Sequence, residues 1–150
     1  MRRISAEYLY DGGSSEPLRN AYVEVADDGT VLAVGKVENP EAEPEFHKGA
    51  IVPGFVNTHC HLELSYLKGK FRKGTGMAGF IDQINEMRDT SSMEEKKADI
   101  AFWMNEMWKR GVTAMGDISN CSDTFECKAD SPMYTRTFLE VFGTEPQDCQ

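Results

Sequence analysis

The order of strand-like and helix-like segments after residue 49 restricts the fold of this chain more than any other feature. A β-rich run covers residues 50–61, two segments with helical periodicity follow, and strand-like runs cover residues 112–115 and 133–142. Strands that alternate with helices form parallel sheets, because each helical crossover returns the chain to the same end of the sheet. The sequence therefore predicts an α/β fold in this part of the chain.

The two helices are predicted from the spacing of apolar residues and from signals at their ends. In the first, apolar residues recur three or four positions apart, at Met77, Phe80, Ile81, Ile84 and Met87. In the second, two serines at positions 91 and 92 each precede a glutamate by three residues, so either can form a capping box. A glycine at position 111 is a natural end for this helix. We expect its apolar stripe to pack against the sheet: Ile100, Trp103, Met104, Met107 and Trp108.

The first fifty residues have a different character and predict β structure. Strand-like runs surround Asp27-Asp28-Gly29-Thr30, and Asp-Gly between β-branched runs is a strong hairpin signal. The acidic, proline-containing segment 38–45 predicts an exposed loop and a seam between two units. We assign a small β unit to residues 1–52 and an α/β unit to residues 53–150.

Charge and composition exclude several classes of function. The chain has 16 Lys and Arg against 25 Asp and Glu, a net charge of −9, which argues against nucleic acid or an anionic membrane as the main partner. No apolar run approaches the roughly 20 residues of a membrane-spanning helix, and the start of the chain lacks the apolar segment of a signal peptide. We therefore expect a cytoplasmic location. The cysteines form no C-x₂-C pair and are expected to be reduced thiols: Cys60, Cys121, Cys127 and Cys149.

His59-Cys60-His61 is the most informative tripeptide. Residues i and i+2 of a strand point to the same side, so both imidazoles converge while Cys60 faces the other way. Two imidazoles at the carboxyl end of a parallel strand make half of a site for zinc, or for iron. The alternative is that the two histidines are polar surface, because the H-x-H pattern alone also occurs by chance. Catalytic zinc normally has three protein ligands, so two cannot complete the site.

Residues 51–63, from Ile51-Val52-Pro53-Gly54 to His61-Leu62-Glu63, resemble the first barrel strand of the metal-dependent amidohydrolase superfamily, in its deaminase and chlorohydrolase branch. Residues 108–117 resemble the step from helix to second strand in that family, and residues 136–143 lie where the third strand would come. The resemblance implies the N-terminal part of a (β/α)₈ TIM-like barrel, about three strands, preceded by a small β-sandwich. A complete barrel needs roughly 250 residues, more than this chain has.

The resemblance implies that His59 and His61 are metal ligands, and that the metal is divalent, zinc or iron. The remaining ligands and the proton-shuttling glutamate of the family lie in later strands, so no residue here is assigned a catalytic acid or base role. Glu63 and Asp117 are candidates for contacts to the substrate or to the metal ligands. A solvated or capping carboxylate is an equal alternative for both.

The implied function is a metal-dependent hydrolase of C–N bonds, a hydrolytic deaminase of a purine-like or other N-heterocyclic small molecule. Because the later ligands are missing, we expect the 150 residues alone to be inactive. One alternative is a non-catalytic truncated barrel that acts as a binding or interaction module, whose open strand edges favour pairing with another chain, including a second copy. Another is a structural metal site made by His59, His61 and a cysteine.

Overall fold

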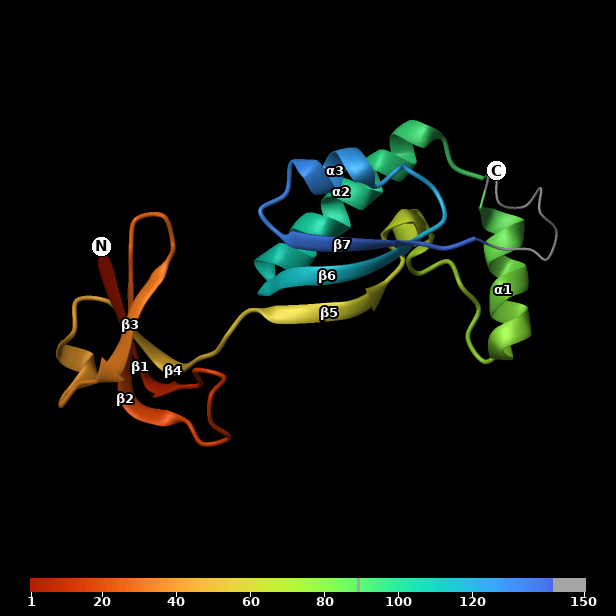
Figure 1. Ribbon diagram of the computed structural model, residues 1–150. Coiled ribbons are helices and arrows are strands. Elements are labelled where there is room, and N and C mark those ends of the chain that lie inside the picture. Colours follow the sequence, from red (N-terminus) through yellow and green to blue (C-terminus); the bar gives the residue numbers. More distant parts are fainter. Residues whose placement is uncertain (89, 142–150) are drawn as a thin grey trace. The chain divides into compact units, whose positions relative to one another are not determined.

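A computed structural model of the chain describes residues 1–88 and 90–141. The chain divides into two compact units, Met1–Pro53 and Gly54–Gln150, and each is described by itself. Their elements are labelled in Figure 1. Among the described residues, no helix has the length and apolar character that a membrane crossing requires.

The first unit is one four-stranded sheet. Its strands are β1 (Arg2–Leu9), β2 (Leu18–Val25), β3 (Val31–Lys36) and β4 (Phe46–Ile51). In the order β3-β2-β1-β4, β2 is antiparallel to both of its neighbours, and β1 is parallel to β4. The predicted hairpin is confirmed between β2 and β3, where Gly29 has a φ of 88° that other residues rarely adopt. The second layer of a β-sandwich remains a prediction.

The segment 38–45 is mostly exposed, as predicted, but it is not the boundary between the two units. It contains a 3₁₀ helix, η1 (Pro40–Ala42), and lies within the first unit. Pro40 is buried, and its carbonyl oxygen accepts a hydrogen bond of 3.0 Å from the hydroxyl of buried Ser5. The segment therefore covers part of the sheet, because a buried hydroxyl needs an acceptor and Pro40 supplies it.

The second unit contains a parallel three-stranded sheet in the order β5-β6-β7. Its elements are β5 (Phe55–Cys60), η2 (Leu62–Leu67), α1 (Gly76–Met87), α2 (Met93–Lys109), β6 (Val112–Ser119), α3 (Phe125–Ala129) and β7 (Tyr134–Leu139). The predicted α/β order and parallel sheet are confirmed. Three details differ. β6 continues to Ser119, so Asp117 lies inside the strand, and the loop after β6 contains the short helix α3. The strand predicted over residues 133–142 is the shorter β7, and residue 142 lies outside the described residues.

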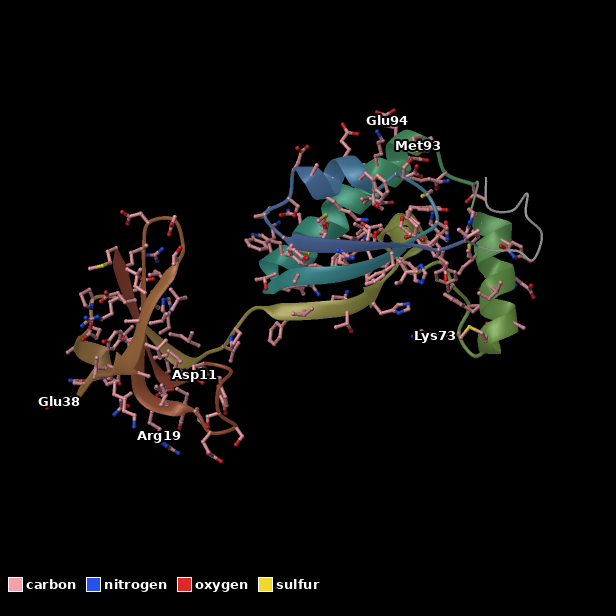
Figure 2. All side chains as sticks on the ribbon, viewed as in Figure 1. Asp11, Arg19, Glu38, Lys73, Met93 and Glu94 are labelled. Atoms are coloured by element: carbon pink, nitrogen blue, oxygen red, sulfur yellow. The ribbon has the colours of Figure 1, made fainter. Side chains whose placement is uncertain are left out.

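The core of the second unit lies between the sheet and α2, and Figure 1 shows α2 and α3 on one side of the strands. Its buried cluster consists of Leu62, Ile100, Met104, Met115 and Met133. Ser92 caps α2: its hydroxyl accepts from the Glu95 amide at 3.2 Å, and the Glu95 carboxylate accepts from the Ser92 amide at 2.8 Å. The predicted capping box is therefore confirmed at Ser92, directly before Met93 and Glu94 (Figure 2).

Candidate functional site

The two histidines of the H-x-H motif lie at the carboxyl end of the parallel sheet. His59 is in β5, whereas His61 follows the last residue of that strand and precedes the first turn of η2. Their ring centroids are 5.3 Å apart, with an angle of 60° between the ring planes. The imidazoles are therefore neighbours. His61 lies just after β5, however, and not within the strand as predicted.

Glu63 is buried beside His61. One of its carboxylate oxygens, Oε1, lies 3.3 Å from Nδ1 of His61, and the other has no hydrogen-bond partner among the described residues. Burial raises the pKa of the Glu63 carboxyl, and the hydrogen bond with His61 acts in the opposite direction. Only 4% of the residue is exposed, so Glu63 is not a solvated surface carboxylate.

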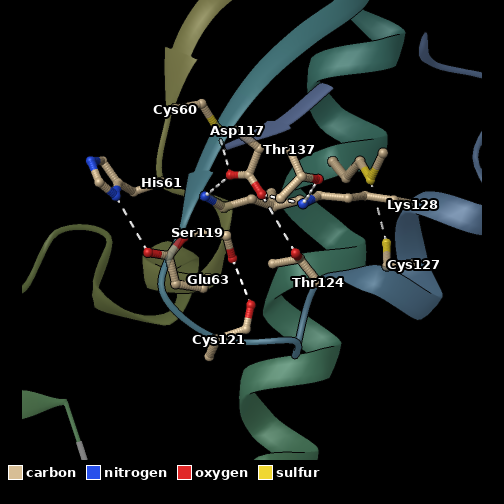
Figure 3. Close-up of polar contacts among 12 residues, drawn as sticks. Cys60, His61, Glu63, Asp117, Ser119, Cys121, Thr124, Cys127, Lys128 and Thr137 are labelled. Carbon is tan, nitrogen blue, oxygen red and sulfur yellow. Dashed lines mark hydrogen bonds and ion pairs between the residues drawn. The ribbon is translucent and has the colours of Figure 1, made fainter. Parts of the chain in front are cut away.

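Asp117 is completely buried in β6, behind the end of β5 (Figure 3). Its Oδ1 accepts a hydrogen bond of 2.8 Å from the backbone amide of Leu62, and its Oδ2 forms an ion pair with Lys128. The Thr124 hydroxyl lies 3.5 Å from the same Oδ2, and Lys128 also donates to the Thr137 hydroxyl at 2.9 Å. The carboxylate of Asp117 is thus satisfied by groups of the protein itself.

Cys60 faces the core, as the strand alternation predicts. Its Sγ lies 4.0 Å from Oδ1 of Asp117, and it packs against the buried cluster under α2. Burial raises the pKa of its thiol to about 12. Within residues 1–88 and 90–141, no group of three or more His, Cys, Asp and Glu side chains is placed to hold a metal ion.

A cavity of about 720 Å³ lies next to the histidine pair. His59 and His61 form one part of its lining. A second part is apolar and comes from η2, α1 and the loop between them: Leu64, Phe71, Met77, Phe80, Ile81 and Ile84. A third part is polar: Asn85, Arg88, Asn120 and Glu140. The arrangement suits an organic molecule with both apolar and hydrogen-bonding parts, in a volume typical of ligand pockets.

The polar part of the cavity was not predicted from the sequence. Arg88 follows α1, and its Nη1 donates a hydrogen bond of 3.3 Å to Oδ1 of Asn120, which follows β6. Glu140 follows β7, where its backbone amide donates to the Ser119 carbonyl. These residues belong to no sequence motif, and only their positions after a helix and after two strands hint at a shared site.

The proteins that are similar to this chain in sequence are named as deaminases. No protein-family model matches the chain. It is 29% identical over 93 residues to a 5-methylthioadenosine/S-adenosylhomocysteine deaminase of Natronomonas pharaonis, covering 62% of this chain and 22% of the relative. It is also 29% identical over 126 residues to an aminodeoxyfutalosine deaminase of Nitratiruptor sp., covering 80% and 31%. The chain thus spans less than a third of the length of either relative.

Solved structures share the fold over nearly the whole chain. An aminofutalosine deaminase of Helicobacter pylori, in complex with methylthio-coformycin, superposes with a TM-score of 0.78 at 24% identity, covering 97% of this chain and 36% of that one. An atrazine chlorohydrolase of Arthrobacter aurescens, complexed with zinc, gives a TM-score of 0.70 at 16% identity, covering 99% and 37%. The predicted resemblance to the deaminase and chlorohydrolase branch of the amidohydrolases is therefore confirmed.

Proposed function

We propose that this chain is the N-terminal part of a metal-dependent hydrolase of C–N bonds, a hydrolytic deaminase of a purine-like or other N-heterocyclic molecule. The observation that carries the proposal is the pair of neighbouring imidazoles at the carboxyl end of a parallel sheet, beside a ligand-sized cavity. Active sites of α/β barrels lie at this end of the strands. The names of the two deaminase relatives support the reaction class.

The second unit has the features expected of the first three strands of a barrel. The register aligns Val56, Ala114 and Tyr134 on one row, next to the row of Met115, which packs in the core. Val56 and Tyr134 are 61% and 69% exposed, so the face turned away from α2 carries uncovered apolar side chains. In a closed barrel this face is interior and is filled by side chains from the remaining strands. The first unit would then be part of the accompanying β-sandwich.

The two histidines fit a divalent metal as partial ligands. When Nδ1 of His61 carries the proton, it donates to Glu63, and its Nε2 is free to bind the metal. Imidazole suits zinc, with iron as the alternative. A divalent metal supplies Lewis acidity and a water of lowered pKa. Glu63 orients the His61 ring in this proposal, and the other ligands and the acid–base group belong to parts of the protein beyond the described residues.

The lining of the cavity supports the proposal that the substrate is a small heterocyclic molecule. The apolar side chains of Phe71, Phe80 and Ile84 can contact a ring or an apolar substituent, while Asn85 and Asn120 can form hydrogen bonds to ring nitrogens or hydroxyls. The free thiols of Cys60, Cys121 and Cys127 fit the reducing conditions of the cytoplasm, where we propose the enzyme acts.

The proposal is tested on the protein expressed from its complete reading frame. We expect a stoichiometric divalent metal in the purified protein and ammonia release from purine-like substrates. His59→Asn and His61→Asn should each lower the metal content and abolish ammonia release, because each removes a ligand. His47→Asn is the matched control, since this histidine lies in β4 of the first unit and is exposed. Metal content that is unchanged by His59→Asn and His61→Asn would refute the proposed site.

A further inference from the structure

We propose that buried Asp117, which forms an ion pair with Lys128, positions His61 by accepting a hydrogen bond from the backbone amide of Leu62. The inference rests on the proposed function, because it takes His61 to be a metal ligand. Asp117 and Lys128 are not among the residues that line the cavity. Their effect is transmitted by the chain segment that carries His61.

The segment around His61 lacks the support of a regular strand. The ladder between β5 and β6 ends with the pair Cys60 and Asp117, one residue before His61. His61 itself has φ and ψ of −116° and 80°, outside the helix that follows. Oδ1 of Asp117 accepts from the Leu62 amide at 2.8 Å and lies 4.0 Å from Sγ of Cys60. One carboxylate oxygen therefore contacts the residues on both sides of His61.

Lys128 is the ion-pair partner of Asp117 in the core. Asp117 is fully buried, and only 6% of the Lys128 side chain is exposed. A buried carboxylate without a cation is strongly unfavourable, whereas a buried ion pair is often no more stabilising than apolar residues of the same size. Stability alone thus gives little reason for the pair. The geometry of the pair gives a better reason, because Lys128 of α3 also donates a hydrogen bond to Thr137 of β7. The ion pair therefore connects Asp117 to both α3 and β7.

The two carboxylates near His61 have complementary tasks in this arrangement. Asp117 holds the backbone after His61, and Glu63 contacts the imidazole ring itself. A metal ligand must be held within about 0.5 Å of its working position, which requires control of both backbone and ring. Loss of the acceptor at position 117 should therefore weaken metal binding while the core stays folded.

The experiment compares two charge-balanced double variants of the 150-residue chain, both in a His47→Gln background. D117N/K128M keeps an amide oxygen that can accept from Leu62, while D117L/K128M has a similar volume and no acceptor. Zn²⁺ is titrated, and the imidazole proton resonances of His59 and His61 are followed by NMR. We expect D117N/K128M to bind Zn²⁺ within about threefold of the parent, and D117L/K128M to bind about tenfold more weakly. Thermal unfolding checks that both are folded.

The outcomes separate this inference from the proposed function. Equal Zn²⁺ affinity of the two double variants overturns the positioning role and leaves His59 and His61 as ligands. Zn²⁺ that shifts neither histidine in the parent overturns the ligand assignment, and the positioning role with it. If D117L/K128M does not fold, D117A/K128M takes its place in the same comparison, because alanine also lacks the acceptor and cannot overpack the core.

Discussion

Glu63 and Asp117 carry the same functional group but differ in how their oxygens are used. Both oxygens of Asp117 have partners within the protein, namely the Leu62 amide and the Lys128 ammonium group. Glu63 has one oxygen next to His61 and one to which no described residue forms a hydrogen bond. A buried polar atom without a partner is costly and often marks a functional site. Asp117 therefore contacts protein groups behind the candidate site, whereas Glu63 contacts one of the two histidines of the site.

Cys60 provides a prediction at the residue scale. Because burial raises the pKa of its thiol to about 12, the thiolate fraction at pH 8 is far below that of an exposed cysteine, and only the thiolate reacts with alkylating agents. We expect iodoacetamide to label Cys60 slowly in the folded chain, with the rate rising as the pH is raised toward 12. The measurement is mass spectrometry of the peptide that contains Cys60 after timed labelling.

The unfolded chain is the control for this prediction. In guanidinium chloride the thiol is exposed and its pKa returns to about 8.5, so labelling at pH 8 should be fast. Equal labelling rates in the folded and unfolded chains would show that the thiol of Cys60 does not face the core.

At the scale of elements, α1 and α2 use similar apolar patterns for different purposes. Ile100 and Met104 of α2 are buried in the core under the sheet. Phe80 and Ile81 of α1 remain 38% and 43% exposed and line the cavity beside the histidines. The periodicity predicts each helix correctly, but it carries no information about what the apolar face contacts.

The N-terminus of α2 gives a prediction that distinguishes two adjacent residues. Ser92→Ala removes the hydroxyl that caps the Glu95 amide and should lower the free energy of unfolding by about 1 kcal/mol. Ser91→Ala is the matched control, because Ser92 supplies the capping contacts, and we expect a change within about 0.5 kcal/mol. Urea unfolding followed by circular dichroism measures both. A larger loss for Ser91→Ala would place the cap one residue earlier.

At the scale of the whole molecule, the described residues supply the two histidines that we propose as metal ligands and only part of an enclosure around them. The sheet of the second unit has a helix-covered face and a face with exposed apolar side chains, including Phe138, which is 50% exposed. No described group of three ligating side chains is present. A site of this kind can bind a metal ion weakly, but it lacks the third ligand that zinc hydrolases use.

We therefore expect the 150-residue chain by itself to show no deaminase turnover. The measurement is ammonia release from adenosine-type and related heterocycles in the presence of Zn²⁺. A complete aminodeoxyfutalosine deaminase, assayed under the same conditions, serves as the positive control. Turnover above the buffer rate by the isolated chain would mean that His59 and His61 suffice, or that other residues complete the site.

The amino-acid sequence by itself determined the local elements and the identity of the histidine pair. The β2–β3 hairpin, the capped start of α2 and the helical course of α1 follow from turn residues, capping residues and periodicity. These signals act over a few neighbouring residues, so they can be read without knowledge of the rest of the fold. His59 and His61 were found in the same way, because only two positions separate them.

Only the tertiary structure decided what surrounds those histidines. The contact of Asp117 with the Leu62 amide joins residues 55 positions apart, and that of Arg88 with Asn120 joins residues 32 positions apart. Asp117 was identified as a candidate, but its burial and its pairing with Lys128 depend on how β6, α3 and the end of β5 pack together. Such contacts leave no periodic signal in the sequence, because their geometry is set by packing between elements distant along the chain.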